Sequence, residues 1–167
     1  MRTGFPFPFL TTESVGPMIA EHGSEWAKDE IATKILQGKL IFGIGYSEPN
    51  SGTDLASLQT KAIKESDGYL INGQKMWTSL ANFSDYIWLA ARTDFEAKNH
   101  KGISMFIVPT DDPGFSMSAI NKRIEFVPQS IAATLNVITS TWSGLSPVFE
   151  HSQRNVSKWI YAWPGCK

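Results

Sequence analysis

A corner of small and polar residues, GYSEPNSGTD at positions 45–54, is the first stretch whose residue types could do chemistry. Gly43 and Gly45 leave one face of the preceding strand without side chains, which suits the close approach of a backbone or a planar ligand. The turn that follows offers hydroxyls and backbone N–H groups, and such a concavity can receive an anionic or carbonyl-bearing ligand. Alternatively, the corner is only a capped turn in which Glu48 and Asp54 accept hydrogen bonds from backbone donors.

A second candidate stretch is GQKMWTS at positions 73–79. Here Trp77 is followed by two hydroxyl side chains, Thr78 and Ser79, at the end of an expected hairpin strand. A large indole can form a shelf for a flat cofactor, or it can be buried in the core, where its burial is strongly favourable. The residues alone leave both interpretations of Trp77 open.

A helix is expected before the corner, over residues 24–38. Ser24 is a suitable N-cap, apolar residues recur every four positions, and Gly38 is a typical C-terminal stop. Residues 12–23 predict a shorter helical turn that an internal Gly-Pro pair breaks. One amphipathic helix cannot bury its own apolar stripe, so this part must pack against another element.

Short β-like runs follow residue 38, separated by Gly, Pro, Asn, Asp or Ser. The pair Asn72-Gly73 supplies the two positive-φ residues of a type I′ turn and predicts a hairpin at that point. Residues 65–68 predict a second tight turn. Strands punctuated in this way predict a small antiparallel β-barrel or sandwich.

The chain of 167 residues is therefore expected to be an α+β fragment in three parts. Residues 1–39 form a short helical part, residues 40–120 a β-domain and residues 121–167 an irregular C-terminal tail. The tail contains no Asp, three of the six tryptophans and no clear strand or helix period, so no structure is assigned to it. A frame change or an early stop in the coding sequence would account for such an aberrant tail.

The composition excludes several classes of function. With a net charge of -1 and 19% charged residues, the chain lacks the clustered Lys and Arg of a nucleic-acid-binding protein. Its single cysteine, Cys166, excludes an intrachain disulfide and a cysteine metal site. No apolar stretch approaches the roughly 20 residues of a membrane helix, and Pro6 and Pro8 interrupt the apolar start, which argues against a signal peptide. A cytoplasmic protein without a metal site is expected.

Three ordered blocks, GYSEPNSGTDLAS, DGYLINGQKMWTS and GISMFIVPTDDPG, resemble the middle β-domain of the acyl-CoA dehydrogenases. The signature of that family is a small residue, an aliphatic residue, Ser or Thr, Glu, two free positions, a small residue, Gly, Ser or Thr, and Asp. From Gly45 to Asp54 every fixed position fits except Tyr46, which replaces the aliphatic residue. Residues 14–39 are similar to the last helices of the family's N-terminal helical domain, so the resemblance covers about residues 4–120.

The resemblance implies FAD as the cofactor and an acyl-CoA thioester, of the kind handled in fatty acid metabolism, as the substrate. In that family a carboxylate base removes the α proton while the β hydrogen leaves as a hydride to flavin N5. Hydrogen bonds to the thioester carbonyl stabilise the developing enolate. The product is a trans-2-enoyl-CoA.

The resemblance also implies cofactor-binding roles for the first candidate stretch. Its members Ile44, Gly45, Tyr46 and Ser47 would run along the flavin, with backbone groups and the Ser47 hydroxyl at the isoalloxazine edge. Because Tyr46 departs from the family pattern, its side chain is expected to point away while its backbone keeps the contact.

The same resemblance implies roles for the second candidate stretch and for the turn. Trp77 would pack against the ring system, and Thr78 and Ser79 would contact it near N5. Thr53 would reach either the CoA side of the substrate or the phosphates of the cofactor. The glycine-bearing strand would thus admit a flat ring that the hydroxyls and amides of the turn orient.

No catalytic residue is assigned in this chain. The family's base belongs to a C-terminal helical bundle that has no counterpart in this sequence and that also forms the homo-oligomer interfaces. Glu48 is expected to be a structural cap of its turn, and Glu125 and Glu150 inherit no role. The chain alone is expected to be inactive, whereas the intact family enzyme passes electrons to an acceptor of the electron-transferring flavoprotein type.

Two other functions stay open at this point. The chain could be a non-catalytic β-barrel remnant or binding module that keeps a groove for flavin or acyl-CoA. It could also derive from a relative on the same scaffold, such as an acyl-CoA oxidase or a flavin monooxygenase. The reactivity of the reduced flavin with oxygen would separate those relatives from a dehydrogenase.

Overall fold

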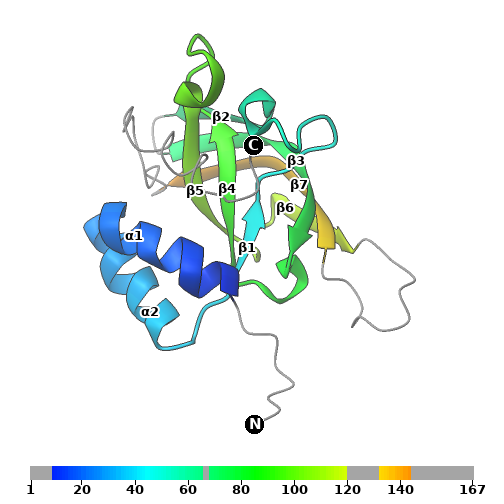
Figure 1. Ribbon diagram of the computed structural model, residues 1–167. Coiled ribbons are helices and arrows are strands. Elements are labelled where there is room, and N and C mark those ends of the chain that lie inside the picture. The colour runs from blue at the N-terminus through cyan, green and yellow to red at the C-terminus, as the bar shows by residue number, and fades with distance from the viewer. Residues whose placement is uncertain (1–8, 66–67, 120–131, 144–167) are drawn as a thin grey trace.

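A computed structural model describes residues 9–65, 68–119 and 132–143 of this protein (Figure 1). Two helical segments come first along the chain and a β-sheet follows, which confirms the predicted order of a short helical part and a β-domain. None of the described helices has the length and apolar character needed to cross a lipid bilayer.

Each helical segment contains a wide π-helical stretch that is followed by an α-helix. The first segment runs through Thr11–Val15 into α1 (Gly16–His22). The second runs through Ala27–Ala32 into α2 (Thr33–Leu36). Their buried residues recur along one side of each segment, so the two segments share one apolar stripe that must face the sheet.

The helix predicted over residues 24–38 is confirmed at both ends. The Ala27 N–H donates a hydrogen bond of 3.2 Å to the Ser24 hydroxyl, which satisfies one of the unpaired donors at the helix start. Gly38 has φ +68°, the left-handed conformation in which a glycine commonly ends a helix. Both end signals could therefore be read from residue types alone.

The break predicted at the upstream Gly-Pro pair is wrong, because the helix continues through it. The Gly16 N–H donates to the Thr11 carbonyl, five residues back, in a turn wider than an α-turn. Pro17 then lies at the start of α1, and the wider turn before it carries the helix past a residue that has no N–H to donate.

Seven strands form one mixed sheet. Strand β4 pairs with β5 along one edge, while β1 and the end of β2 share its other edge; β3, β7 and β6 follow beyond β2. Strands β1 and β2 run parallel to β4, and the other pairs are antiparallel. The strands are β1 (Phe42–Gly45), β2 (Lys61–Glu65), β3 (Gly68–Ser79), β4 (Tyr86–Arg92), β5 (Ile103–Pro109), β6 (Phe115–Ala119) and β7 (Ala132–Ser143).

The predicted β-domain is thus present, but the sheet is neither entirely antiparallel nor a closed barrel. The chain passes from β1 through the corner to β2 without reversing its direction, and it then reverses at β3, at β4 and at β5. Among the described strands, β1 and β5 each pair only with β4, and β6 pairs only with β7, so no strand pairing closes the sheet.

The hairpin turn predicted at Asn72-Gly73 is wrong, because β3 continues through both residues. Asn72 is paired with a residue of β2 on one side and of β7 on the other, and the register against β7 shifts at this point. A Cβ on Gly73 would collide with the Thr60 side chain. The extra residue of that shift lies on β7, between Ile138 and Ser140. Gly73 therefore marks a close approach of Thr60 rather than a turn. The second predicted turn is confirmed, since Glu65 pairs with Gly68 at the end of the β2–β3 hairpin.

The segment 121–167, to which the sequence assigned no structure, contributes β7 (Ala132–Ser143). This strand pairs antiparallel with β3 and β6, so the sheet extends past residue 120. The remaining residues of that segment, 121–131 and 144–167, lie outside the described residues, as do Cys166 and the acids at 125 and 150.

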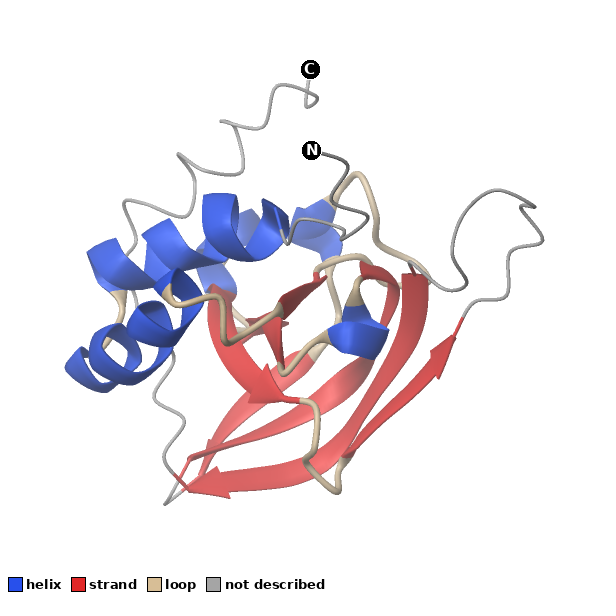
Figure 2. Ribbon diagram, turned by 90° about the horizontal axis from the view of Figure 1, so that it is seen from below, coloured by secondary structure: helices blue, strands red, loops and turns tan. Residues whose placement is uncertain are grey.

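Two apolar clusters fill the space on the two faces of the sheet. In Figure 2 the helices lie together against one face of the strands. Alternate residues of β4 serve the two sides, since Trp88 and Ala90 belong to the helix-side cluster and Ile87 and Leu89 to the opposite one. Because β4 is buried on both faces, packing fixes its position in the molecule. Through its pairing with β1, β4 also fixes the position of β1 and of the corner that follows β1.

Candidate functional site

The corner after β1 is closed by short backbone hydrogen bonds. The Glu48 N–H donates to the Ser51 carbonyl at 2.6 Å, and the Ser51 N–H donates back to the Glu48 carbonyl at 3.2 Å. The Ser51 hydroxyl then donates to the Asp54 carbonyl at 2.7 Å. These contacts bury Ser51 and leave Thr53 and Asp54 exposed on the loop beyond the corner.

The side chain of Glu48 is buried and makes four hydrogen bonds. It accepts them from the Gln59 N–H at 2.6 Å, the Thr60 N–H at 2.9 Å, the Thr60 hydroxyl at 2.6 Å and the Lys75 ammonium at 2.8 Å. The expectation that Glu48 accepts backbone N–H bonds is confirmed, although the donors are the two residues directly before β2 rather than residues of its own turn. Glu48 thus ties the corner to two other parts of the sheet.

Burial and hydrogen bonding act in opposite directions on this pair of charges. Burial alone would raise the pKa of Glu48, but the hydrogen bonds from Lys75, Thr60 and Gln59 outweigh burial and hold that pKa below its ordinary value. Burial lowers the pKa of Lys75, and the contact with Glu48 opposes that effect only in part. Lys75 has 0% of its surface exposed, so its charge depends on Glu48 and on the hydrogen bonds around it.

The open glycine face of β1 is filled by the protein itself. A Cβ on Gly45 would lie 2.9 Å from Ile87 Cγ2 and 3.0 Å from Leu89 Cδ1, and one on Gly43 would lie 2.9 Å from Ile87 Cδ1. The two distances of 2.9 Å are shorter than real Cβ contacts and the third is tighter than most, so the two glycines let β1 pack closely over β4 side chains. The interpretation that these glycines leave a bare face for a planar ligand is therefore wrong.

The structure brings the two candidate stretches together at the ends of β1 and β3. The Met76 N–H donates to the Ser47 carbonyl at 2.8 Å, and the Lys75 ammonium donates to the Tyr46 carbonyl at 3.1 Å. Tyr46 and Ser47 consequently lie beside Lys75 and Met76, directly before Trp77, although about thirty positions separate the two stretches in the chain.

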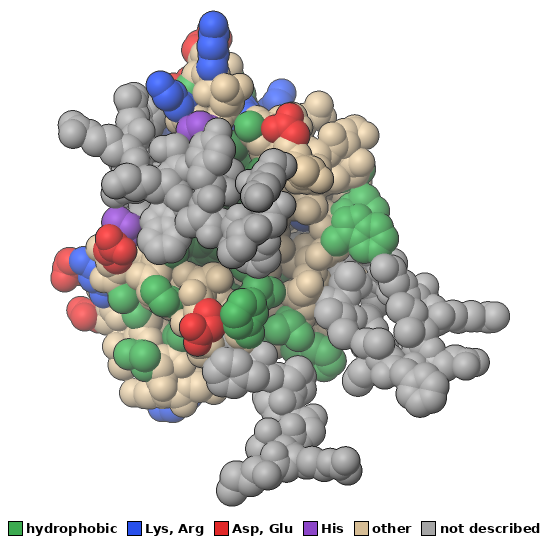
Figure 3. All heavy atoms as spheres, in the orientation of Figure 1, with side chains coloured by type: hydrophobic (Ala, Val, Ile, Leu, Met, Phe, Trp, Pro, Cys, Tyr) green, Lys and Arg blue, Asp and Glu red, His purple; other side chains and the backbone are tan. Residues whose placement is uncertain are grey.

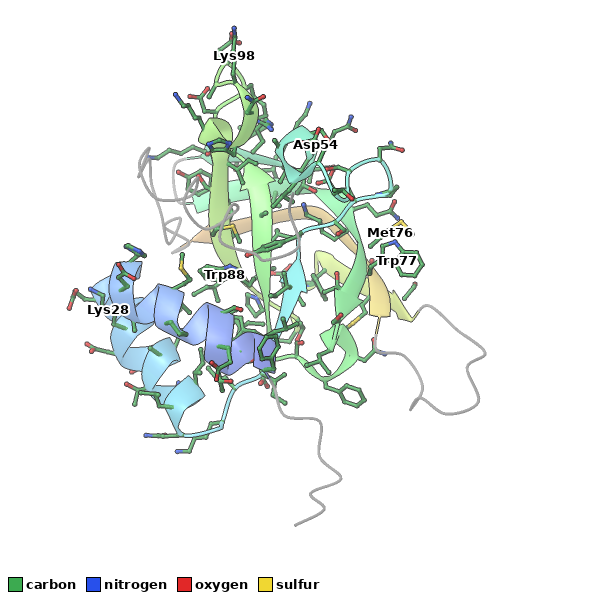
Figure 4. All side chains as sticks on the ribbon, in the orientation of Figure 1. Lys28, Asp54, Met76, Trp77, Trp88 and Lys98 are labelled. Carbon is green, nitrogen blue, oxygen red and sulfur yellow. The ribbon has the colours of Figure 1, made fainter. Side chains whose placement is uncertain are left out.

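Trp77 is a surface residue, because half of it (50%) is exposed. Figure 4 shows its ring at the edge of the sheet, pointing outward, and hydrophobic side chains reach the surface on the same side in Figure 3. Its φ of 61° is a costly conformation for a bulky residue, and the register of β3 against β7 shifts between Lys75 and Thr78. The interpretation of Trp77 as a core residue is wrong.

The next residue, Thr78, is buried at 0% exposure, and its hydroxyl has no hydrogen-bond partner among the described residues. A buried hydroxyl without a partner costs about 1 to 3 kcal/mol, so it favours any ligand that can pair with it. Ser79 follows at the end of β3 and is half-buried. Two hydroxyls therefore stand next to an exposed indole at this edge.

Tyr46 and Thr53 lie differently with respect to the corner and to residues 77–79. The Tyr46 side chain packs against the helix-side cluster and forms a hydrogen bond with the Trp88 side chain, and burial raises the pKa of its phenol to about 12. Only its backbone is therefore available at the corner. Thr53 is exposed, and no contact between it and residues 77–79 is found in the described part of the chain, so its role stays a prediction.

Lys75 is the one important residue that the sequence reasoning did not single out. Its signal was present, because buried residues alternate along β3 from Tyr69 through Ile71 and the same period places Lys75 on the inner face. A lysine at an inward position requires an acid opposite to it, and Glu48 was the unpaired candidate.

Comparisons with known proteins concern this same part of the chain. Residues 43–125 match the family model of the acyl-CoA dehydrogenase middle domain. The chain is 51% identical over 119 residues to acyl-CoA dehydrogenase FadE29 of Mycobacterium tuberculosis, a match that covers 71% of this chain and 31% of the relative. It is similar in structure to the ChsE4-ChsE5 complex from Mycobacterium tuberculosis, with a TM-score of 0.77 and 40% identity over 95% of this chain and 40% of that one.

A further structural relative is a glutaryl-CoA dehydrogenase from Mycobacterium smegmatis in complex with FADH2. Its TM-score is 0.66 at 31% identity, over 76% of this chain and 31% of that one. The chain spans about a third of the length of the curated relatives it matches, 31% and 30% for two of them from Mycobacterium tuberculosis. What it shares with them is centred on the middle domain, and through this domain the chain belongs to the acyl-CoA dehydrogenase family.

Proposed function

We propose that this chain supplies the flavin-binding β-domain of an FAD-dependent acyl-CoA dehydrogenase. The observation that supports this most strongly is the contact between the ends of β1 and β3, in which the Met76 N–H donates to the Ser47 carbonyl. This contact brings together the two stretches that the family resemblance assigns to the isoalloxazine ring. Neither stretch alone carries a specific signal.

Three features at this edge fit a flavin. Trp77 presents a half-exposed indole, whose face can stack on a planar ring. Thr78 holds a buried hydroxyl that lacks a partner among the described residues, and the polar edge of a flavin could supply one. Ser47 is half-buried just after β1, and its side chain carries a hydroxyl. A relative from Mycobacterium smegmatis is described as a complex with FADH2.

The residues of this chain would orient the cofactor. Backbone groups of Ile44, Gly45 and Tyr46 and the hydroxyl of Ser47 line one side of the edge, and Trp77, Thr78 and Ser79 line the other. When bound, FAD supplies the hydride acceptor for α,β-dehydrogenation of an acyl-CoA thioester. The hydroxyls would hold the ring edge by hydrogen bonds, and Trp77 would shield it from water.

Thr53 and Glu48 have different places in this proposal. Thr53 is exposed beyond the corner, where its hydroxyl and the neighbouring amides suit a phosphate of the cofactor or the CoA side of the substrate. Glu48 is not proposed as the base, because its carboxylate is already bonded to Lys75 and to two backbone amides. We therefore expect this chain alone to bind FAD without oxidising an acyl-CoA.

The remaining partners follow from the family. The electron acceptor is proposed to be of the electron-transferring flavoprotein type, and the intact enzyme to be a cytoplasmic homo-oligomer. One structural neighbour is named as a complex of ChsE4 with ChsE5, so a second kind of subunit is the alternative form of assembly.

The test is a titration of the purified chain with FAD, followed by flavin fluorescence, with FMN and ADP as separate ligands. Saturable binding of FAD and FMN is expected, because the ring itself is held between the two stretches. Binding of FAD and ADP with none of FMN would contradict a ring site. In parallel, the chain is incubated with acyl-CoA substrates and an artificial electron acceptor, and oxidation of any of them would contradict the expected inactivity.

A further inference from the structure

Lys75 is fully buried although it carries a charge. Taking an ammonium group out of water costs several kcal/mol, which its pairing with Glu48 offsets only when the geometry is good. A buried ion pair can usually be replaced by apolar residues of the same shape without loss of stability. Stability alone therefore does not explain why a lysine occupies this inward position of β3.

The contacts of Lys75 and its neighbour bind two successive carbonyls of the corner. The Lys75 ammonium donates to the Tyr46 carbonyl at 3.1 Å and to Glu48 Oε1 at 2.8 Å. The Met76 N–H donates to the Ser47 carbonyl at 2.8 Å. The two peptide groups that contain the Tyr46 and Ser47 carbonyls are thus both held by hydrogen bonds from β3.

Holding the Tyr46 carbonyl also fixes the direction of the Ser47 N–H. In a planar trans peptide the C=O of one residue and the N–H of the next point in opposite directions. Because the Tyr46 carbonyl points to Lys75, the Ser47 N–H points away from it. In the part of the chain that the structure describes, no acceptor for that N–H or for the Ser47 hydroxyl is found.

We infer that Lys75 is a positioning residue, whose ammonium group holds the Tyr46–Ser47 peptide so that the Ser47 N–H is presented to the flavin edge. This inference rests on the flavin site proposed above. Glu48 keeps the ammonium group in place and charged, and its bonds to the two residues directly before β2 fix the far side of the pair. Lys75 itself has no exposed surface and acts only through the backbone that it holds.

The test compares the unmodified chain with a variant in which the buried pair is replaced by neutral side chains. Removing Lys75 alone would leave the Glu48 carboxylate buried without its partner, so the comparison is the unmodified chain against Glu48→Gln/Lys75→Met. Lys101→Met, at an exposed lysine, is the control for the loss of one positive charge. If the methionine variant does not fold, Glu48→Gln/Lys75→Gln takes its place, because its amide is too short to reach the same carbonyl.

Two quantities are measured for each variant: the Ser47 amide resonance of the ¹⁵N-labelled chain without flavin, and the Kd for FAD. We expect loss of the ammonium group to shift the Ser47 resonance and to weaken FAD binding about tenfold, as for a lost hydrogen bond to a charged group. Glu48→Gln/Lys75→Arg should recover part of the affinity, and Lys101→Met should change neither quantity.

The outcomes separate this inference from the proposed function. If the chain binds FAD but the Ser47 resonance and the Kd are the same with and without the ammonium group, Lys75 is only a structural residue and the inference is wrong. If the Ser47 resonance shifts as expected but even the unmodified chain binds no FAD, the proposed function fails and the flavin role of Lys75 fails with it.

Discussion

At the scale of single residues, the exposure of Trp77 follows from a local irregularity of β3. A strict period of two from Lys75 would point Trp77 into the core. The positive φ of Trp77 and the register shift against β7 add one residue to the strand, so the alternation is inverted after the shift. As a result Trp77 faces outward and Thr78 inward. The residue types alone gave no sign of this inversion, which is why both interpretations of Trp77 stayed open.

Trp77→Ala should weaken FAD binding by about 1 to 3 kcal/mol, the range found for aromatic side chains that stack on a base. Trp26→Ala is the matched control, because Trp26 is exposed to a similar extent (55%) but belongs to the helical part. Equilibrium titration of both variants with FAD measures the difference. Equal affinities of the two variants would remove Trp77 from the flavin site.

The Glu48–Lys75 pair predicts a dependence of stability on pH. A carboxyl whose pKa is lower in the folded than in the unfolded chain stabilises the fold above its ordinary pKa of 4.5. That contribution is lost as the pH falls through the lowered value of the folded state. Glu48→Gln removes the titrating group and leaves Lys75 without its charged partner, so it should cost about 3 to 5 kcal/mol at pH 7.

Urea unfolding of both proteins from pH 7 down to pH 3 measures this effect. The difference between the unmodified chain and Glu48→Gln should become smaller toward the acid end, as Glu48 itself is protonated. Glu65→Gln, at an exposed glutamate, is the control and should change the free energy of unfolding little at any pH. A difference for Glu48→Gln that stays constant over the whole range would show that its carboxylate charge does not stabilise the fold.

At the scale of elements, the sequence was informative wherever a local signal was sufficient. Ser24 and Gly38 predicted the ends of the second helical segment because capping depends only on neighbouring residues. Asn72-Gly73 misled because a glycine suits both a hairpin turn and a close approach of another side chain, and only the position of Thr60, outside the strand, decides between them. The parallel pairing of β1 with β4 also depends on distant residues and had no local signal.

Gly73→Ala tests the close approach of Thr60 to β3. The added Cβ would collide with the Thr60 side chain, so the free energy of unfolding should fall by about 1 to 3 kcal/mol, as in other overpacked sites. Gly52→Ala is the matched control, since a Cβ there meets nothing within 4 Å. Chemical denaturation of the two variants would contradict this account if both lost the same stability.

At the scale of the whole molecule, the site depends on a sheet that is packed on both faces. The helix-side cluster and the opposite cluster both include residues of β4, and β4 pairs with β1, which leads into the corner. The Glu48–Lys75 pair then joins the corner to β3. The sequence could predict which family this arrangement resembles, but the meeting of β1 and β3 follows only from the folded sheet.

The measurement that tests the central claim most directly is a map of the amide resonances of the ¹⁵N-labelled chain before and after FAD is added. The account predicts that two separate stretches respond together, residues 44–47 and residues 77–79, while the helical residues 24–38 do not. Resonance changes confined to only one of the two stretches, or centred on the helices, would contradict a flavin site at the junction of β1 and β3.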